Sequence, residues 1–390
     1  MKLSDRIIGI TGNGPDGWGV FLRARQMADT GEQVTELTIG EHDIRTDPTI
    51  LDAMHRAALS GQTGYAAVPG VAALRDCIAE RITARTGIRT GRDNVHITAG
   101  GQAGLFASHC AVCDPGDRAL FIDPHYTTYP GTIRAASAVP VPVRARARDG
   151  FQPRPEAIAE QAAGAASLLI NTPNNPTGAV YGTETLTGIA DLCREQDLWL
   201  ISDEVYDTQV WEGAHVSPRS LPGMAGRTLV IGSMSKSHAM TGSRVGWVVG
   251  PEEVIARMTD LATATTYGIP GFVQDAALFA LRQGEALEER VAAPFRRRRA
   301  KAMKILAGQN TLAPVPAQGA MYVMLDVRTT GLSGDDFANR LLDEERIAVM
   351  PGESFGRAAA GHIRVALTVE DGALEDALGR IIGFARGIAG

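Results

Sequence analysis

Lysine, cysteine and long apolar runs are scarce in this chain. Only 4 of its 38 lysine and arginine side chains are lysines, and 4 cysteines among 390 residues are too few for a disulfide scaffold. No apolar run is long enough to span a bilayer, and the N-terminus has neither the apolar core nor the cleavage site of a signal peptide. We therefore expect a cytoplasmic protein that does not enter a membrane.

The chain also lacks an excess of positive charge, since 44 acidic side chains outnumber 38 lysine and arginine side chains. The formal net charge is −6, which argues against a general affinity for nucleic acid. Hydrophobic residues make up 44% of the chain, enough for a substantial buried core. Because 390 residues exceed what one small core requires, we expect two domains of unequal size.

Short apolar strands alternate with helices over much of the chain. The predicted strands are 95–98, 119–122, 167–170, 198–201 and 228–231, and the predicted helices between them include 103–112 and 185–196. This alternation is typical of an α/β fold with a mostly parallel sheet covered by helices on both faces. Such sheets bind ligands at the carboxyl ends of their strands.

The pattern changes after about residue 285. A long charged helix is predicted over 285–306, followed by short strands at 322–325 and 362–365 and a C-terminal helix at 374–385. We therefore predict a large domain of residues 46–285. A smaller α+β domain would combine residues 1–45 and 286–390, with the N-terminal segment closing over the ligand site.

Lys236 lies in the most informative segment. Residues 233–236 read Ser-Met-Ser-Lys, and Arg244 follows eight residues after the lysine. A lysine amine can form a Schiff base with an aldehyde cofactor, and neighbouring hydroxyl and guanidinium groups can hold a phosphate. A lone lysine in an apolar, glycine-rich stretch therefore indicates chemistry rather than surface charge.

Two further motifs follow predicted strands. Residues 171–178 read Asn-Thr-Pro-Asn-Asn-Pro-Thr-Gly, which suits a tight turn but is more specific than a turn requires. Residues 202–206 read Ser-Asp-Glu-Val-Tyr. Asp203 could cap a helix, or it could pair with the protonated ring nitrogen of a cofactor, which would keep the carboxylate ionised.

Together, 171–178, 202–206 and 233–244 resemble the three signature stretches of the class I/II aminotransferases, which are pyridoxal-phosphate enzymes of fold type I. Weaker similarity extends from 37–41 to 361–364. The resemblance implies an aspartate aminotransferase-like fold and pyridoxal 5′-phosphate as cofactor. It also implies ping-pong transfer of an amino group from an L-amino acid to a 2-oxo acid, with 2-oxoglutarate as the expected acceptor.

The resemblance assigns catalytic roles to several residues. Lys236 would form the Schiff base and act as general base and acid, and Asp203 would pair with the ring nitrogen. Tyr206 and Asn175 would hydrogen-bond the 3′-oxygen of the ring, and Tyr126 would stack on its face.

It also assigns the phosphate site. Ser233, Ser235 and Arg244 would face the phosphate. Gly101 and Gln102 open a helix directly after a strand, and their N–H groups would contact the same phosphate at the positive end of that helix.

The substrate and partner contacts come from more distant segments. Arg364 would take the α-carboxylate of the substrate bidentately, and Gly40 would approach that carboxylate through its backbone. Asn175 would also contact the substrate. Tyr65 would reach the phosphate of a neighbouring subunit, which implies a homodimer with shared sites.

Each assignment has a structural alternative. Tyr126 could be a plain core residue, because Tyr129 is an equally suitable aromatic residue nearby. Arg364 could form an interdomain salt bridge, and Tyr65 could pack within its own subunit. Ser235 could serve packing alone.

Three other features favour structural interpretations. Cys110 and Cys113 have metal or redox spacing, but without a second ligand pair they are interpreted as buried structural residues, and no metal site is expected. The arginines 296–299 suit the solvated face of a helix. His42 stands where the family usually has proline, and it either touches the substrate or occupies a loop.

Other functions of the same fold stay open. A C–S lyase, a decarboxylase or a cyclising synthase would use the same cofactor site, although Tyr206 favours transamination. A pyridoxal-phosphate-sensing regulator would need an added DNA-binding domain. Residues 13–21 are expected to cover the pocket, where Trp18 or Phe21 would favour an apolar or aromatic substrate. No second arginine that would select aspartate is identified.

Overall fold

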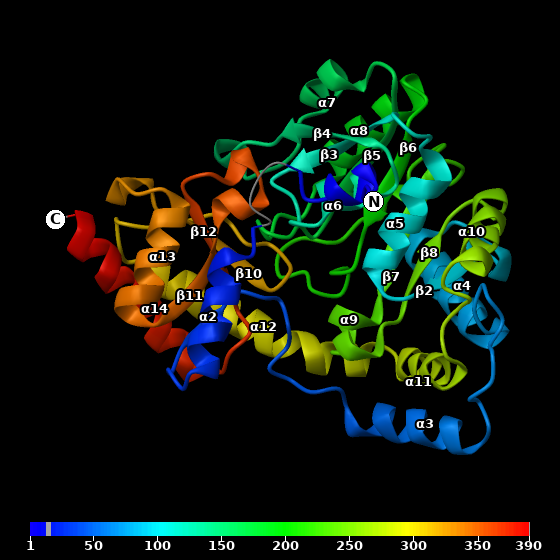
Figure 1. Ribbon diagram of the computed structural model, residues 1–390, viewed down its shortest axis with the longest axis horizontal. Coiled ribbons are helices and arrows are strands. Elements are labelled where there is room, and N and C mark those ends of the chain that lie inside the picture. The colour runs from blue at the N-terminus through cyan, green and yellow to red at the C-terminus, as the bar shows by residue number, and fades with distance from the viewer. Residues whose placement is uncertain (13–16, 390) are drawn as a thin grey trace.

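The computed structural model describes residues 1–12 and 17–389. Two sheets organise the fold (Figure 1). A seven-stranded sheet lies on the cyan and green side of the molecule, and a five-stranded sheet lies beneath the orange and red helices. The prediction of an α/β protein with a mostly parallel sheet and a smaller α+β part is confirmed.

The seven-stranded sheet has the order β2-β8-β7-β6-β5-β3-β4. Its strands are β2 (Val95–Thr98), β3 (Arg118–Asp123), β4 (Val139–Arg144), β5 (Ala165–Asn171), β6 (Trp199–Asp203), β7 (Thr228–Ser233) and β8 (Gly246–Val249). Strands β3, β4, β5, β6 and β7 are parallel to one another, whereas β8 is antiparallel to both of its neighbours, β2 and β7. The carboxyl ends of β5, β6 and β7 therefore meet at one edge.

Helices cover both faces of this sheet because its strands are apolar on both sides. In β5, Leu168 and Ile170 pack into the cluster that includes α7 and α8, while Leu169 packs into the cluster of α5, α6 and α10. These five helices are α5 (Gly101–Val112), α6 (Tyr129–Ala135), α7 (Pro155–Ala162), α8 (Thr183–Glu195) and α10 (Glu252–Ala264). Three more, α3 (Pro48–Leu59), α4 (Ala72–Thr86) and α11 (Gly271–Arg282), pack near β2 and β8.

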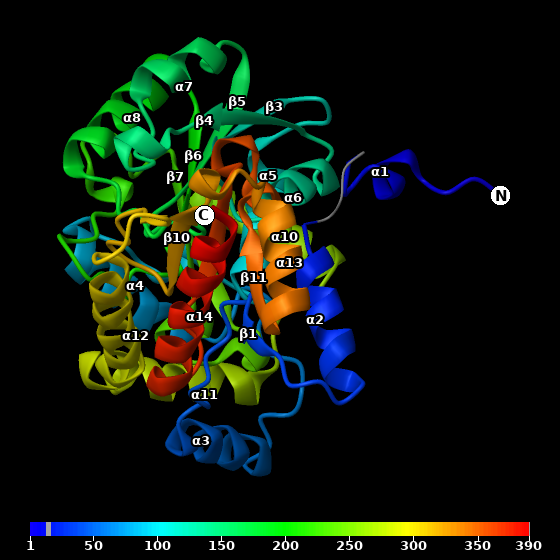
Figure 2. The ribbon, with the colours of Figure 1, turned by 90° about the vertical axis from the view of Figure 1, so that its left-hand side faces the viewer.

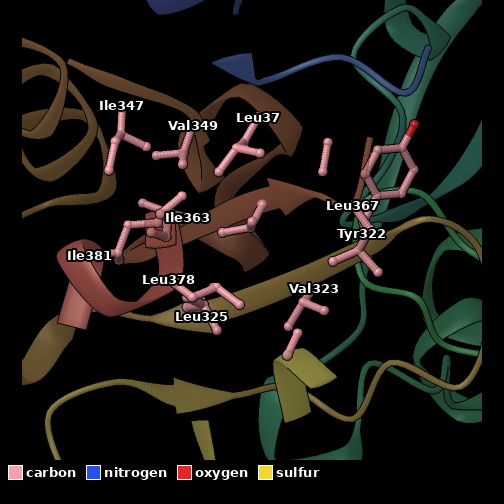
Figure 3. Close-up of a cluster of buried hydrophobic side chains, with 14 of the residues drawn as sticks. Leu37, Tyr322, Val323, Leu325, Ile347, Val349, Ile363, Leu367, Leu378 and Ile381 are labelled. Atoms are coloured by element: carbon pink, nitrogen blue, oxygen red, sulfur yellow. The ribbon is translucent and has the colours of Figure 1, made fainter. Parts of the chain in front are cut away.

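The five-stranded sheet has the order β1-β11-β12-β10-β9. Its strands are β1 (Thr35–Leu37), β9 (Ala313–Pro314), β10 (Tyr322–Asp326), β11 (Ile347–Pro351) and β12 (His362–Ala366). Its aliphatic core is packed against α13 (Gly334–Glu345) and α14 (Asp371–Ala389). In Figure 3, Leu37, Val349, Ile363 and Leu325 lie in this core, and the ring of Tyr322 lies at its edge, near the ribbon of the larger sheet.

Strand β1 joins the N-terminal part of the chain to this second sheet, since it pairs in parallel with β11. Helix α2 (Gly19–Asp29) packs beside it, and α1 (Asp5–Ile8) extends away from the body (Figure 2). The long α12 (Glu285–Leu306) runs along the lower side of the molecule from one sheet towards the other (Figure 1). The division at 46–285 is in keeping with this arrangement and stays a prediction.

Helix α12 corrects one expectation about charge. The run 296–299 does not lie wholly on a solvated face, because Arg298 is buried and holds Asp43 with both terminal nitrogens, at 2.8 and 2.6 Å. Among the described residues, none of the helices combines the length and the apolar character needed to cross a membrane.

Candidate active site

A cavity of about 410 Å³ opens where β5, β6 and β7 end. This is the edge at which parallel sheets bind ligands. Its walls contain most of the residues that the sequence predicted to bind cofactor or substrate. They are Gly40, Gly101, Gln102, Tyr126, Asn175, Asp203, Tyr206, Ser233, Ser235, Lys236, Arg244 and Arg364. Segments far apart in the chain thus meet at one cavity.

Lys236 reaches the cavity from α9 (Met234–Ser237), a four-residue helix that begins directly after β7. Its Nζ donates a hydrogen bond to the carbonyl oxygen of Gly40. Burial lowers the pKa of the amine from its usual value, and the positive charges of Arg364 and Arg244 lower it further. A buried amine of lowered pKa suits a nucleophile that also moves protons.

Asp203 ends β6 and is a buried residue of the cavity wall. Its Oδ2 accepts a hydrogen bond from the Tyr129 hydroxyl at 2.6 Å, and its Oδ1 accepts one from the backbone N–H of Val205 at 3.3 Å. Burial raises the pKa of this carboxyl to about 6, and the two hydrogen bonds oppose that rise. The site thus offers a carboxylate that a cationic ring nitrogen would stabilise.

The two aromatic candidates of the sequence have different positions in the structure. Tyr126 and Tyr129 both line the cavity, with their rings edge to face at 5.9 Å between centroids. The hydroxyl of Tyr129 is committed to Asp203, so Tyr126 is the one left to stack on a ring. Sequence reasoning named Tyr129 only as an alternative to Tyr126, and nothing in the local motif signals its bond to the carboxylate.

The first turn of α5 forms an anion site together with Arg244. The N-cap residue Gly100 gives the helix no side-chain cap, so the first N–H groups, at Gly101 and Gln102, remain to bind a ligand. Gly100 has a φ of +80°, and a Cβ there would collide with the Arg244 guanidinium. That guanidinium is oriented by the carbonyl oxygens of Thr241, at 2.9 Å, and Ala99, at 3.1 Å.

The two serines beside the lysine also lie at this end of the cavity. The Ser233 hydroxyl accepts the backbone N–H of Ser235 at 3.1 Å, which caps α9, and it donates to the carbonyl oxygen of Val245 at 3.3 Å. Ser235 lines the cavity as well. The helix N-terminus, the guanidinium and the Ser235 hydroxyl are together the donors that a phosphate needs, and the Ser233 hydroxyl could join them only by giving up its bond to Val245.

Arg364 of β12 also lines the cavity. Its Nη1 donates to Asn175 Oδ1 at 2.7 Å, and its Nη2 donates to the carbonyl oxygen of Thr38. The guanidinium lies between the rings of Tyr322 and Phe355, at 4.2 and 4.4 Å from their centroids. Its Nε is buried without a partner among the described residues. A buried guanidinium with an unpaired N–H group favours a carboxylate ligand.

Tyr322 is a cavity residue that sequence reasoning placed in a strand but assigned no function. Its hydroxyl lies 3.0 Å from that of Tyr206, and a Cβ on Gly40 would collide with it. This contact explains why glycine is required at position 40. The only sequence signal was the strand itself, because the partners of Tyr322 are remote in the chain.

Some of the predicted residues lie away from the cavity or outside the described part of the chain. Tyr65 is 92% exposed, and within its own chain it packs edge to face on Tyr267 at 5.1 Å rather than lining the cavity. Residues 13–16 of the predicted covering segment lie outside the described residues. Trp18 lines the cavity, whereas Phe21 packs against Trp18 at 5.8 Å and against the core.

A second cavity of about 1050 Å³ adjoins the first. The two share Trp18, Gln102, Thr128 and Arg244. The N-terminal residues 10–12 and 17–20 form one side of it, and Asp335 and Glu353 add carboxyl groups on the other.

These groups fit pyridoxal 5′-phosphate. The anion site suits its phosphate, Asp203 its ring nitrogen, Tyr126 its ring face and Lys236 its aldehyde. The unpaired Nε of Arg364 leaves a place for the carboxylate of an amino acid. The fold and the site therefore define a pyridoxal-phosphate enzyme that acts on amino acids.

Comparison with known proteins gives the family. A profile described as aminotransferase class I and II matches residues 32–381. The chain is 42% identical to the arginine–pyruvate transaminase of Pseudomonas aeruginosa, over 98% of this chain and 97% of that protein. It is 36% identical to the aspartate/prephenate aminotransferase of Thermus thermophilus, over 94% of each.

A solved structure agrees. The aspartate aminotransferase of Thermus thermophilus with maleate matches with a TM-score of 0.92 at 33% identity, covering 98% of this chain and 100% of that one. The protein thus belongs to the aminotransferase class I and II family. It is a pyridoxal-phosphate-dependent transaminase, and the enzyme class and cofactor predicted from the sequence are confirmed.

Proposed function

We propose that this transaminase takes the amino group of a long basic L-amino acid, with L-arginine as the first candidate, and passes it to pyruvate. The observation that carries this proposal is the similarity over nearly the whole chain to an arginine–pyruvate transaminase, which exceeds the similarity to the aspartate aminotransferases. The acceptor expected from the sequence, 2-oxoglutarate, is the alternative. The cytoplasmic location also stays a prediction.

The second cavity supports a long donor. It continues from the cofactor cavity past Trp18 and has more than twice its volume. Its walls carry carboxyl groups at Asp335 and Glu353 but also guanidinium groups at Arg134, Arg244 and Arg357, so the length of this cavity, and not its net charge, supports a long side chain.

The roles of the cavity residues follow from their positions. When bound, pyridoxal 5′-phosphate supplies an aldehyde that condenses with amines and a ring that accepts an electron pair. Arg364, with Asn175 beside it, would orient the substrate through its carboxylate. Lys236 would take the α-proton from the substrate and return it, because its neutral amine is favoured by burial. Asp203 would hold the ring nitrogen protonated.

The remaining contacts restrict the reaction. Tyr206 and Tyr322 hold each other's hydroxyls in place, so the wall beside Lys236 is fixed before substrate enters. Gly40 supplies the carbonyl oxygen on which the free amine rests. Because both tyrosines are buried, this wall limits the access of water from its side, which favours proton return over side reactions.

A panel of half-reactions tests the proposal. L-Arginine, L-citrulline, L-aspartate and L-phenylalanine would each be mixed with the enzyme, and conversion of the cofactor to its amine form followed by absorbance. L-Arginine should exceed the others in kcat/KM by about tenfold or more, with neutral L-citrulline as the control for side-chain charge. Pyruvate and 2-oxoglutarate would then be compared as acceptors.

The possible results are distinct. A preference for L-aspartate or L-phenylalanine over L-arginine would overturn the donor assignment but leave the transaminase. Better turnover with 2-oxoglutarate would overturn pyruvate. If an amino acid were consumed with release of carbon dioxide or of a thiol, a decarboxylase or lyase of the same fold would be indicated.

We also propose that the enzyme is a homodimer in which Tyr65 serves the neighbouring site. The supporting observation is the exposed aromatic pair of Tyr65 and Tyr267, 92% and 53% exposed, which a second chain would cover. A phenolic hydroxyl there could donate to the partner's phosphate.

Complementation would test this shared site. Lys236→Ala and Tyr65→Ala subunits carrying different tags would be co-expressed and the mixed dimer purified. If Tyr65 serves its partner, one of the two sites is intact, and the mixed dimer should have about half the wild-type kcat. Activity no higher than half that of the Tyr65→Ala homodimer would place Tyr65 in its own subunit's function.

A further inference from the structure

His42 contacts the backbone of the lysine directly. Its Nε2 lies 3.0 Å from the carbonyl oxygen of Lys236, and its ring packs edge to face on Phe295 at 5.2 Å between centroids. The side chain is only 7% exposed. Of the two interpretations that the sequence left open, the loop position agrees with the structure, since residue 42 lies between β1 and α3, and His42 is not among the residues that line the cofactor cavity.

The carbonyl of Lys236 needs such a partner. Helix α9 has four residues, Met234–Ser237, so its last carbonyl groups receive no hydrogen bond from a following turn. Gln209 Nε2 is the other donor to the same oxygen, at 3.3 Å. The backbone from which the catalytic amine extends is therefore held by side chains from outside the helix.

The protonation of His42 is determined by this contact. A carbonyl oxygen only accepts, so Nε2 carries the proton, and Nδ1 is the unprotonated nitrogen. Nδ1 is buried and has no partner within the described ranges. Burial lowers the pKa of His42 to about 3, so the ring stays neutral and keeps this one donor.

His42 belongs to a segment that contacts the lysine loop at several points. We call residues 40–46 the clamp segment and residues 236–241 the lysine loop. Gly40 accepts from the Lys236 amine, and Thr46 donates to the carbonyl oxygen of Ala239 at 2.7 Å. Glu41 and Thr241 add a side-chain hydrogen bond of 3.3 Å.

The clamp segment is itself anchored. Asp43 accepts two hydrogen bonds from the buried Arg298 of α12, and β1 lies just before the segment in the second sheet. A bidentate carboxylate–guanidinium pair is among the more rigid side-chain contacts. The anchored clamp segment therefore contacts Lys236 at two points, its side-chain amine and its backbone carbonyl.

From these contacts we propose that His42 is a positioning residue for Lys236: its Nε2–H holds the lysine carbonyl and so fixes the reach of the amine that binds the cofactor. This proposal rests on the cofactor role of Lys236 but not on the choice of amino acid donor or acceptor. Loss of the hydrogen bond would let the end of α9 move and expose the amine to more water. Since burial is what lowers the lysine pKa, that movement raises it.

Three variants separate positioning from packing. His42→Gln keeps an N–H donor at the place of Nε2, whereas His42→Asn puts its donor at the place of Nδ1, too short to reach the carbonyl. His42→Phe keeps the ring against Phe295 and removes the donor. The Gln and Asn variants are therefore a pair matched in chemistry and different in reach.

The main readout needs no substrate. The pKa of the linkage between Lys236 and pyridoxal 5′-phosphate would be titrated by absorbance in the holoenzyme, and the melting temperature recorded alongside. His42→Phe and His42→Asn should raise this pKa by about half a unit or more, the size of one lost hydrogen bond, and His42→Gln should leave it near wild type. With any competent donor, kcat should fall about tenfold in the Phe and Asn variants, with KM changed about twofold or less.

The results discriminate clearly. A wild-type linkage pKa in His42→Phe would overturn the proposal, because that variant lacks the donor but retains the ring. Equal pKa values in the Gln and Asn variants would overturn it as well, since reach would then be irrelevant. A failure of the donor panel would leave these titrations unaffected, so the two proposals fail separately.

Discussion

Replacing Lys236 with alanine should lower kcat by about 10⁴-fold and abolish covalent retention of pyridoxal 5′-phosphate. Within the described part of the chain, Lys236 is the one lysine of the cavity wall, so no other amine stands ready to replace it. Its amine rests on the Gly40 carbonyl, and alanine leaves that oxygen without its donor. The measurement is borohydride reduction of the holoenzyme, then dialysis and absorbance or mass of the protein.

Lys304→Ala is the matched control. Lys304 is exposed on α12 and away from the cavity, so its loss should change neither retention nor kcat beyond about twofold. Cofactor that stays bound to the Lys236→Ala protein after reduction would show that another residue forms the linkage. Lys301 and Lys304 would then be the residues to examine by peptide mapping.

Most strands of the main sheet could be predicted because each one is marked by the residues of its own short segment. Strands buried on both faces appear in the sequence as continuous apolar runs, and the prediction of 167–170 lies within β5, Ala165–Asn171. Two strands of the sheet were missed for identifiable reasons. In β4, Pro140 and Pro142 disguise an edge strand, and β8 is a short antiparallel strand opened by Gly246.

The site was predictable where its motifs follow strands and unpredictable where remote side chains meet. Asp203 and Lys236 come together because β6 and β7 are parallel neighbours. The bond from Tyr129 to Asp203 depends instead on how α6 packs on the sheet. The burial of Arg298 depends on Asp43, 255 residues away, and no local charge pattern reports such a pairing.

Asp203→Asn should lower kcat by about 10³-fold, the second largest effect expected. A neutral amide cannot hold the ring nitrogen in its protonated form, so the ring loses most of its capacity to accept the electron pair. Asparagine is nearly the same size, and its single oxygen can still accept from Tyr129 or from Val205. The loss should therefore fall on kcat with each donor, while the cofactor remains bound to Lys236.

The adjacent carboxylate gives the control. Glu204 is buried beside Asp203 in sequence, but it faces away from the cavity and binds His215 at 3.0 Å and Ser217 at 2.7 Å. Glu204→Gln should keep kcat within about threefold of wild type, although it lowers the melting temperature. Equal losses of kcat in the two variants would show that general disruption of this strand end, and not the ring nitrogen, explains the effect.

The same substitution has a distinct signature in the cofactor-free protein. Burial raises the pKa of Asp203 to about 6, above its usual value of 3.8, so the folded state binds a proton that the unfolded state releases in this window. The wild-type protein therefore loses stability as the pH rises through this window, whereas the Asp203→Asn variant, which has no carboxyl to titrate there, does not.

Relative to wild type, Asp203→Asn should gain about 2 kcal/mol in unfolding free energy between about pH 4.5 and about pH 8. Denaturant unfolding at the two pH values measures this, and a variant whose stability parallels that of the wild type would show that the carboxyl titrates normally. A stability gain together with a loss of kcat would mean that the buried charge is costly in the empty site and is retained for the ring nitrogen it is placed to meet.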